Sequence, residues 1–193
     1  GCNSVLATRM ALSHAEYAVT EAGFAFDLGA EKFFDIKCRT AGLNPSAVVI
    51  VATVRALKMH GGVSLDALAL PDPAAVEAGL ENLAAHLDAA EKFAKPVVVA
   101  INLFSADTPD ELRVVQSYCQ SRGVACSPAN VFGAGGAGAL QLAEAVVAAA
   151  DSAPSPLKTL YALDDDPEAK ITTIATSIYG AKEVAILPTA KSK

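Results

Sequence analysis

The chain has 193 residues, 52% of them hydrophobic, and a formal net charge of −6. This length and composition suffice to bury a core as one domain or as two small lobes. The negative charge argues against broad attraction to nucleic acid or to an anionic membrane, so cations that bind a ligand must act locally. Four widely spaced cysteines show neither metal-ligand spacing nor a disulfide framework, which favours a reduced, cytoplasmic setting.

The first third of the chain is predicted to alternate between helix and strand. Apolar spacing, strand-forming runs and turn residues distinguish the segments. In chain order we expect a helix over 4–14, a short buried strand over 17–21, a loop over 23–29, a helix over 30–40, a break at 42–45 and a strand over 47–53.

The remainder continues the alternation. A helix is expected after Pro73, and 139–150, the longest run of small apolar residues, is too short to cross a bilayer. Helices alternating with apolar strands predict an α/β fold with a mostly parallel sheet and flanking helices. The further predicted elements are a strand over 97–102, a helix over 108–121, a strand over 123–126, a helix over 139–150, a linker over 151–156, a helix over 168–179 and an edge strand over 182–187.

Residues 51–62 read Val-Ala-Thr-Val-Arg-Ala-Leu-Lys-Met-His-Gly-Gly and form the most informative segment. They place Arg55, Lys58 and His60 just beyond a strand and before a glycine pair. Open α/β sheets bind anionic ligands at the carboxyl ends of their strands. We therefore expect these three side chains to face an anion.

Polar and aromatic residues also follow the strand over 97–102. Asn102 has a side-chain amide and Asp107 a carboxylate, and together they could form paired hydrogen bonds with the edge of a heterocycle. Phe104 lies between them and could stack on a flat ligand. The alternative for Phe104 is a loop phenylalanine that folds onto the core.

The segment Gly133-Ala-Gly-Gly-Ala-Gly138 matches G-x-G-x-x-G and runs into a helix. A dinucleotide site is one interpretation, but a Pro/Ser linker follows that helix instead of a second strand ending in an acid. The favoured interpretation is a loop whose backbone at Gly135 and Gly136 approaches a ligand or another lobe, with Phe132 as a second stacking ring. The sequence contains no G-x-x-x-x-G-K-[ST] phosphate-binding loop and no legible metal-ligand cluster.

Together these motifs resemble the formate–tetrahydrofolate ligases, also called formyltetrahydrofolate synthetases. The resemblance implies an ATP-dependent ligase that activates formate as formyl phosphate, which N10 of tetrahydrofolate attacks to give 10-formyltetrahydrofolate. It also implies Mg²⁺ with the nucleotide, a monovalent cation (K⁺ or NH₄⁺) and a homotetramer. The segments that carry it, besides 51–62, are Val19–Phe24, Gly29–Phe33, Ile36–Arg39, Val97–Asn102 and Ile178–Gly180.

Carried over to this chain, the resemblance implies roles for particular residues. Phe104 and Phe132 correspond to two aromatic residues that sandwich the pterin ring, and Arg55, Lys58 and His60 to residues facing the phosphates or formyl phosphate. The sequence departs from the family pattern near the second ring. The family commonly has tryptophan where Phe132 stands, and alanines at 134 and 137 replace its lysine and glutamate.

By the same resemblance, residues 1–95 are the later part of a P-loop NTPase-like nucleotide-binding domain. Residues 96–193 are a smaller α/β domain that contacts folate and is incomplete at its end. Because the family's P-loop is missing, we expect this chain alone to be inactive. The alternative is a noncatalytic folate-binding or assembly module that acts with a partner chain carrying the P-loop.

Overall fold

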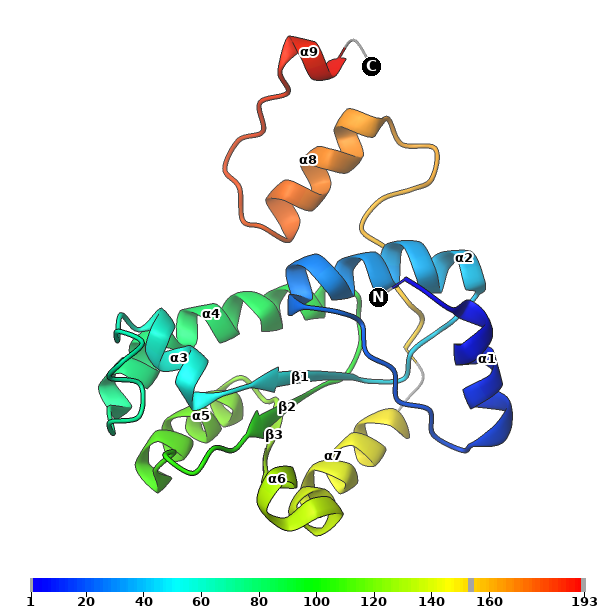
Figure 1. Ribbon diagram of the computed structural model, residues 1–193. Coiled ribbons are helices and arrows are strands. Elements are labelled where there is room, and N and C mark those ends of the chain that lie inside the picture. The colour runs from blue at the N-terminus through cyan, green and yellow to red at the C-terminus, as the bar shows by residue number, and fades with distance from the viewer. Residues whose placement is uncertain (1, 153–154, 192–193) are drawn as a thin grey trace. The chain divides into compact units, whose positions relative to one another are not determined.

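The computed structural model describes residues 2–152 and 155–191 (Figure 1). The chain forms two compact units. The first, Pro45–Ser155, is called the sheet unit; the second, Gly1–Asn44 with Pro156–Lys193, is called the helical unit. The expected junction at Lys95 and Pro96 lies inside the sheet unit, and a boundary between enzyme domains at that point stays a prediction.

The sheet unit contains a three-stranded parallel sheet in the order β1-β2-β3. The strands are β1 (Val48–Ala52), β2 (Val97–Asn102) and β3 (Ala125–Ala129). The pairing of β1 with β2 begins with Val48 opposite Val97. The pairing of β2 with β3 ends with Asn102 opposite Ala129. The predicted α/β fold with a parallel sheet is confirmed, although β3 begins two residues later than expected.

Helices connect the strands and cover the sheet. Several begin at a side-chain cap: the carboxylate of Asp72 accepts a hydrogen bond from the Ala75 N–H (2.9 Å), and Pro73 occupies the first turn. The helices of this unit are α3 (Val54–His60), α4 (Pro73–Glu91), α5 (Pro109–Ser121), α6 (Val131–Ala134), the 3₁₀ turn η3 (Gly135–Ala139) and α7 (Leu140–Ala150).

The main core lies between the sheet and helices α4 and α5. Val99 and Ile101 of β2 point into it, because alternate residues of a strand face opposite sides. Val98 and Ala100, on the other face, are also buried, and α7 contacts β2 and β3. Parallel strands covered on both faces read as continuous apolar runs, as β2 does. The predicted core residues of α4 are all buried: Val76, Leu80, Leu83 and Leu87.

The apolar helix was predicted too short to cross a membrane, but it continues through α6 and η3. Within the described residues, the segment Val131–Ala150 is long and apolar enough for a span by length and composition, with mean hydropathy 1.4. A single such helix is weak evidence for a span. Leu142, Val146 and Ala149 are half-buried at helical spacing, and α7 contacts the sheet. We therefore describe α7 as a helix that covers β2 and β3.

The helical unit departs most from the predictions. The expected strand over 17–21 is irregular, with Tyr17 and Val19 exposed, and the expected edge strand over 182–187 is irregular too. A strand forms beside another strand, and the sheet in the described part of the chain consists of β1, β2 and β3. The expected loop over 23–29 is instead mostly helical. The helices are α1 (Val5–His14), a continuous run made of η1 (Ala25–Ala30), η2 (Phe33–Cys38) and α2 (Arg39–Ala41), then α8 (Pro167–Ser177) and α9 (Pro188–Lys191).

Candidate functional site

The three parallel strands end at one edge of the sheet, here called the carboxyl edge. It consists of the residues that follow the strands: 53–60 after β1, 102–111 after β2 and 130–138 after β3. The Leu103 N–H donates to the Ala129 carbonyl (3.1 Å), which extends the pairing of β2 with β3 to this edge. Ligands of open α/β sheets bind at such edges. All the predicted site residues lie on it.

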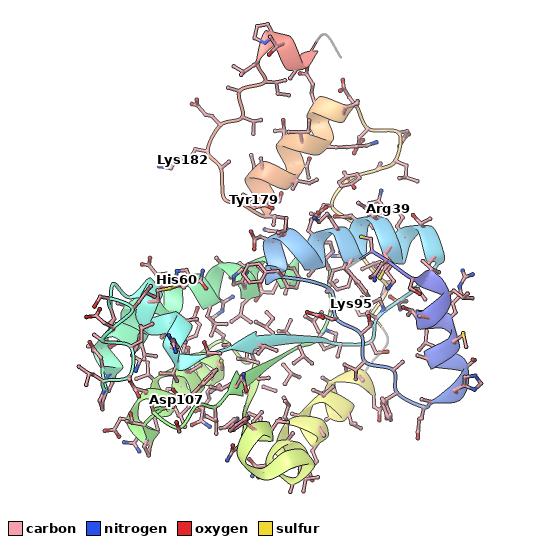
Figure 2. The ribbon with its side chains drawn as sticks, viewed as in Figure 1. Arg39, His60, Lys95, Asp107, Tyr179 and Lys182 are labelled. Atoms are coloured by element: carbon pink, nitrogen blue, oxygen red, sulfur yellow. The ribbon has the colours of Figure 1, made fainter. Side chains whose placement is uncertain are left out.

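Helix α3 carries the three predicted cations. It begins directly after β1, where the Thr53 hydroxyl accepts a hydrogen bond from the Ala56 N–H (3.0 Å). Arg55 and His60 are exposed, whereas Lys58 is buried. Figure 2 shows His60 at the same end of the sheet unit as Asp107. The structure therefore separates the three cations into two exposed side chains and one enclosed side chain.

The position of α3 is fixed by close packing against α4. A Cβ at Gly79 would lie 1.9 Å from the Leu57 carbonyl oxygen, and a Cβ at Gly61 would lie 2.0 Å from the Ala75 carbonyl oxygen. Any side chain at either glycine would push the two helices apart. This packing gives the first glycine of the pair at 61–62 a structural reason independent of any ligand.

Lys58 forms a buried ion pair with Glu111 of α5. Its Nζ lies 2.9 Å from Glu111 Oε1, and the two side chains are 1% and 0% exposed. The Lys58 ammonium also donates to the Leu70 carbonyl (3.1 Å). These protein partners give Lys58 a structural role, while the expected contact with phosphate stays a prediction.

Glu111 collects further donors around its carboxylate. Oε1 accepts the Asp72 N–H (2.9 Å), and Oε2 accepts both the N–H (2.9 Å) and the hydroxyl (2.8 Å) of Thr108. Thr108 and Glu111 together form the capping box of α5. Burial alone would raise the pKa of Glu111, but the hydrogen bonds from Asp72, Lys58 and Thr108 outweigh it and lower the pKa to about 2. The carboxylate is therefore ionised at neutral pH.

The loop after β2 presents Phe104. The carboxylate of Asp107 accepts the Phe104 N–H (2.9 Å) and so closes a tight turn. Burial raises the pKa of Asp107 above its ordinary value, and the nearby Glu111 charge acts in the same direction. Phe104 is 48% exposed, which excludes the alternative of a ring folded into the core. Asn102, at the end of β2, is half-buried.

The glycine-rich segment after β3 wraps around Asn130. The Asn130 side-chain oxygen accepts the Gly133 N–H (3.0 Å), and its backbone N–H donates to the Gly138 carbonyl (2.9 Å). A Cβ at Gly138 would lie 2.1 Å from the Asn130 carbonyl oxygen, and Gly135 has a φ of +57°. The turn thus needs glycines for its own closure. Gly136 lies beside Gly135, exposed like it.

Phe104 and Phe132 therefore follow adjacent paired strands at one edge. Phe132, in α6, is fully exposed. No strand after α7 joins the described part of the sheet, so the dinucleotide-binding unit proposed as an alternative for the glycine-rich segment is not completed there. The register of β2 and β3 places the two strand ends that precede these rings side by side.

Glu111 is the residue of this edge that the sequence interpretation missed. The Thr108-Pro-Asp-Glu111 spacing is a capping-box signature, and it was available in the sequence. The sequence does not show that Glu111 pairs with Lys58, because the two residues belong to different helices. Among residues 2–152 and 155–191, no three His, Cys, Asp or Glu side chains gather as metal ligands would.

The fold and this edge define an α/β protein whose parallel sheet presents exposed cationic and aromatic side chains at the ends of its strands. The family model for formate–tetrahydrofolate ligase matches residues 1–193. A formate–tetrahydrofolate ligase from Granulibacter bethesdensis is 54% identical over 184 residues, which cover 95% of this chain and 32% of that relative. The chain belongs to the formate–tetrahydrofolate ligase family. It spans about a third of the length of this curated relative.

Proposed function

We propose that this chain is the folate-contacting part of a formate–tetrahydrofolate ligase and holds the pterin ring between Phe104 and Phe132. The observation that carries the proposal is the placement of two exposed aromatic rings after adjacent parallel strands. Stacking is the usual way in which proteins bind flat heterocycles. Asn102 and Asp107, together with the backbone at Gly135 and Gly136, are proposed to contact the edge of the same ligand.

Arg55 and His60 are proposed to face the phosphate side of the reaction. Both are exposed on α3, which starts where β1 ends. In the reaction proposed for the whole enzyme, N10 of tetrahydrofolate forms a bond to the formyl carbon, the bond from that carbon to the phosphate oxygen breaks, and the proton of N10 ends on the released phosphate. Negative charge grows on the departing phosphate, and nearby cations stabilise it. Lys58 is proposed to support them from its buried position.

ATP does not fit the residues of this chain, because they include no phosphate-binding loop. Activation of formate with ATP is therefore proposed for the whole ligase, with Mg²⁺ bound to the nucleotide and a K⁺ or NH₄⁺ ion as the monovalent cation. The whole ligase is also proposed to be a homotetramer located in the cytoplasm. This chain alone is proposed to bind tetrahydrofolate without forming 10-formyltetrahydrofolate.

The experiment is an anaerobic calorimetric titration of tetrahydrofolate into the chain and its ring variants. Replacing Phe132 by Leu keeps an apolar side chain but removes the stacking face, so we expect affinity to fall about five- to 150-fold, as loss of about 1–3 kcal/mol of stacking would give. Phe104→Leu should have a similar effect. Phe132→Trp, with a larger face, should bind at least as tightly as the parent.

Val147→Ala is the matched control. Val147 is a partly exposed apolar residue in the last turn of α7, away from the strand ends, and its truncation should leave affinity unchanged. Equal affinity in the parent and both leucine variants would refute the pterin clamp. Formation of 10-formyltetrahydrofolate by the chain alone would refute its proposed lack of activity.

A further inference from the structure

We infer that Glu111 is a positioning residue that fixes the distance between the anion-facing helix α3 and the pterin-facing loop after β2; this inference rests on the proposed function. Glu111 touches neither proposed ligand-facing surface, since its side chain is fully buried. It acts through the residues that its carboxylate holds. Those residues come from three separate segments, and two of these, α3 and the loop after β2, belong to the carboxyl edge.

The first oxygen of Glu111 holds α3 and the start of α4. Oε1 lies 2.9 Å from Lys58 Nζ and accepts the Asp72 N–H at 2.9 Å. Lys58 lies three residues after Arg55 and two before His60 on a helix of only seven residues. A helix this short moves as one piece, so anchoring Lys58 sets the position of both exposed cations.

The second oxygen holds the loop that carries Phe104. Oε2 accepts the N–H and the hydroxyl of Thr108. Thr108 directly follows Asp107, whose carboxylate accepts the Phe104 N–H at 2.9 Å. The path from Glu111 to the aromatic ring therefore passes through two hydrogen-bonded turns with no free segment between them.

Stability alone gives a weak reason for this pair. Removing two charges from water is costly, and replacing a buried ion pair by apolar residues of similar volume is often neutral or stabilising. A buried pair does specify geometry, because its bonds are satisfied in one arrangement of the surrounding elements. Here those elements are the ones that present the proposed site.

The test compares the double variant Lys58→Met/Glu111→Leu with Val115→Ala. The double variant removes both charges, but it leaves the Asp72 N–H and the N–H and hydroxyl of Thr108 without their acceptor, so its thermal midpoint should fall below that of the parent. Val115 lies one turn after Glu111 and is fully buried in the core. Its truncation should lower the midpoint but leave the carboxylate and its partners in place.

The first readout is affinity for tetrahydrofolate, measured by calorimetry. We expect the double variant to bind at least tenfold more weakly than the parent, and Val115→Ala to bind like the parent although its midpoint is lowered as well. Glu111→Gln, which keeps the shape and the acceptor oxygen that faces Thr108, should recover part of the affinity. A double variant that binds as tightly as the parent would overturn the inference.

The second readout needs no ligand. Hydrogen exchange followed by mass spectrometry should show faster exchange at 54–60 and 103–108 in the double variant, but not in Val115→Ala. If the parent chain binds no tetrahydrofolate, the proposed function fails and exchange still decides the role of Glu111. Unchanged exchange in both segments would refute the positioning role even if tetrahydrofolate binds.

Discussion

Both units bury acidic side chains, Glu111 in the sheet unit and Glu31 with Asp35 in the helical unit, but the pKa values of the two glutamates shift in opposite directions. In the sheet unit, Glu111 faces the Lys58 ammonium and three hydrogen-bond donors, and its pKa is lowered to about 2. In the helical unit, burial followed by the charge and hydrogen bond of Asp35 raises the pKa of Glu31 to about 7. The difference shows that the partners of a buried carboxyl decide its charge.

The donors of the helical unit are directed at Asp35 instead of Glu31. Asp35 Oδ1 accepts the Leu160 N–H (2.9 Å) and the Arg39 guanidinium (3.1 Å). Arg39 also donates to the Tyr161 carbonyl (2.7 Å) and stacks on the Tyr161 ring at 4.6 Å. This cluster fastens the segment at 160–161 to the long helical run. Glu31, one turn earlier, is left to hold a proton.

The largest effect is expected from breaking the better-satisfied cluster. Glu111→Ala strands the Lys58 ammonium in the core, and removal of one partner of a buried pair costs about 3–5 kcal/mol. Urea unfolding followed by circular dichroism measures the loss. Lys58→Met/Glu111→Leu is the control and should recover the part of the loss that comes from the stranded charge, while the donors of Asp72 and Thr108 stay unpaired. A loss below about 1 kcal/mol in the single variant would show that water reaches the pair.

The opposite pKa shifts predict opposite responses to pH. Because the fold raises the pKa of Glu31, its contribution to stability is present below about pH 4.5 and is lost as pH rises through 7. Because the fold lowers the pKa of Glu111, its contribution is present above about pH 4.5 and is lost as pH falls towards 2.

Glu31→Gln tests the helical unit, since glutamine resembles the protonated acid. The variant and the parent should unfold alike below pH 4.5, and at pH 8 the variant should be more stable by roughly 3 kcal/mol, the value of a shift of this size. Urea unfolding across pH 4 to 8 measures this divergence. Glu81→Gln, at an exposed position on α4, is the control and should not diverge in this way. Parallel pH curves for Glu31→Gln and the parent would contradict a protonated Glu31.

A smaller loss is expected from disturbing the packing that places Lys58. Gly79→Ala puts a Cβ against the Leu57 carbonyl, and such overpacking costs about 1–3 kcal/mol. Gly136→Ala is the matched control, because nothing lies within 4 Å of a Cβ there. Urea unfolding of both variants gives the comparison. Equal stability of the two would mean that α3 and α4 separate without cost.

The difference between the sheet unit and the helical unit also explains which elements the sequence could predict. The strand at 97–102 and the spacing of Val76 and Leu80 were predicted correctly, because continuous apolar runs and helical periodicity are local signals. The strand expected over 17–21 was wrong, because strand-forming residues become a strand only beside a partner. Among the described residues of the helical unit, no strand lies beside that segment.

At the candidate site, position along the chain was predictable and pairing was not. The sequence placed Phe104 and Phe132 after strands, and the parallel register brings those strand ends together. It grouped Lys58 with Arg55 and His60 because they are neighbours in sequence. The structure separates them by burial instead: Lys58 is enclosed against α5, while Arg55, three residues before it, is exposed.

The smallest effect is expected where ion pairs are exposed. Arg122, at the end of α5, lies 2.6 Å from Asp88 and 3.0 Å from Glu91, but both carboxylates are well exposed. Water and salt screen such pairs, which contribute about 0.2–1 kcal/mol. Arg122→Ala should therefore lower the free energy of unfolding by less than 1 kcal/mol, and the loss should shrink further in 1 M salt. Urea unfolding at low and high salt measures both quantities. A salt-independent loss as large as that of Glu111→Ala would mean that burial is not what separates strong from weak charge clusters in this protein.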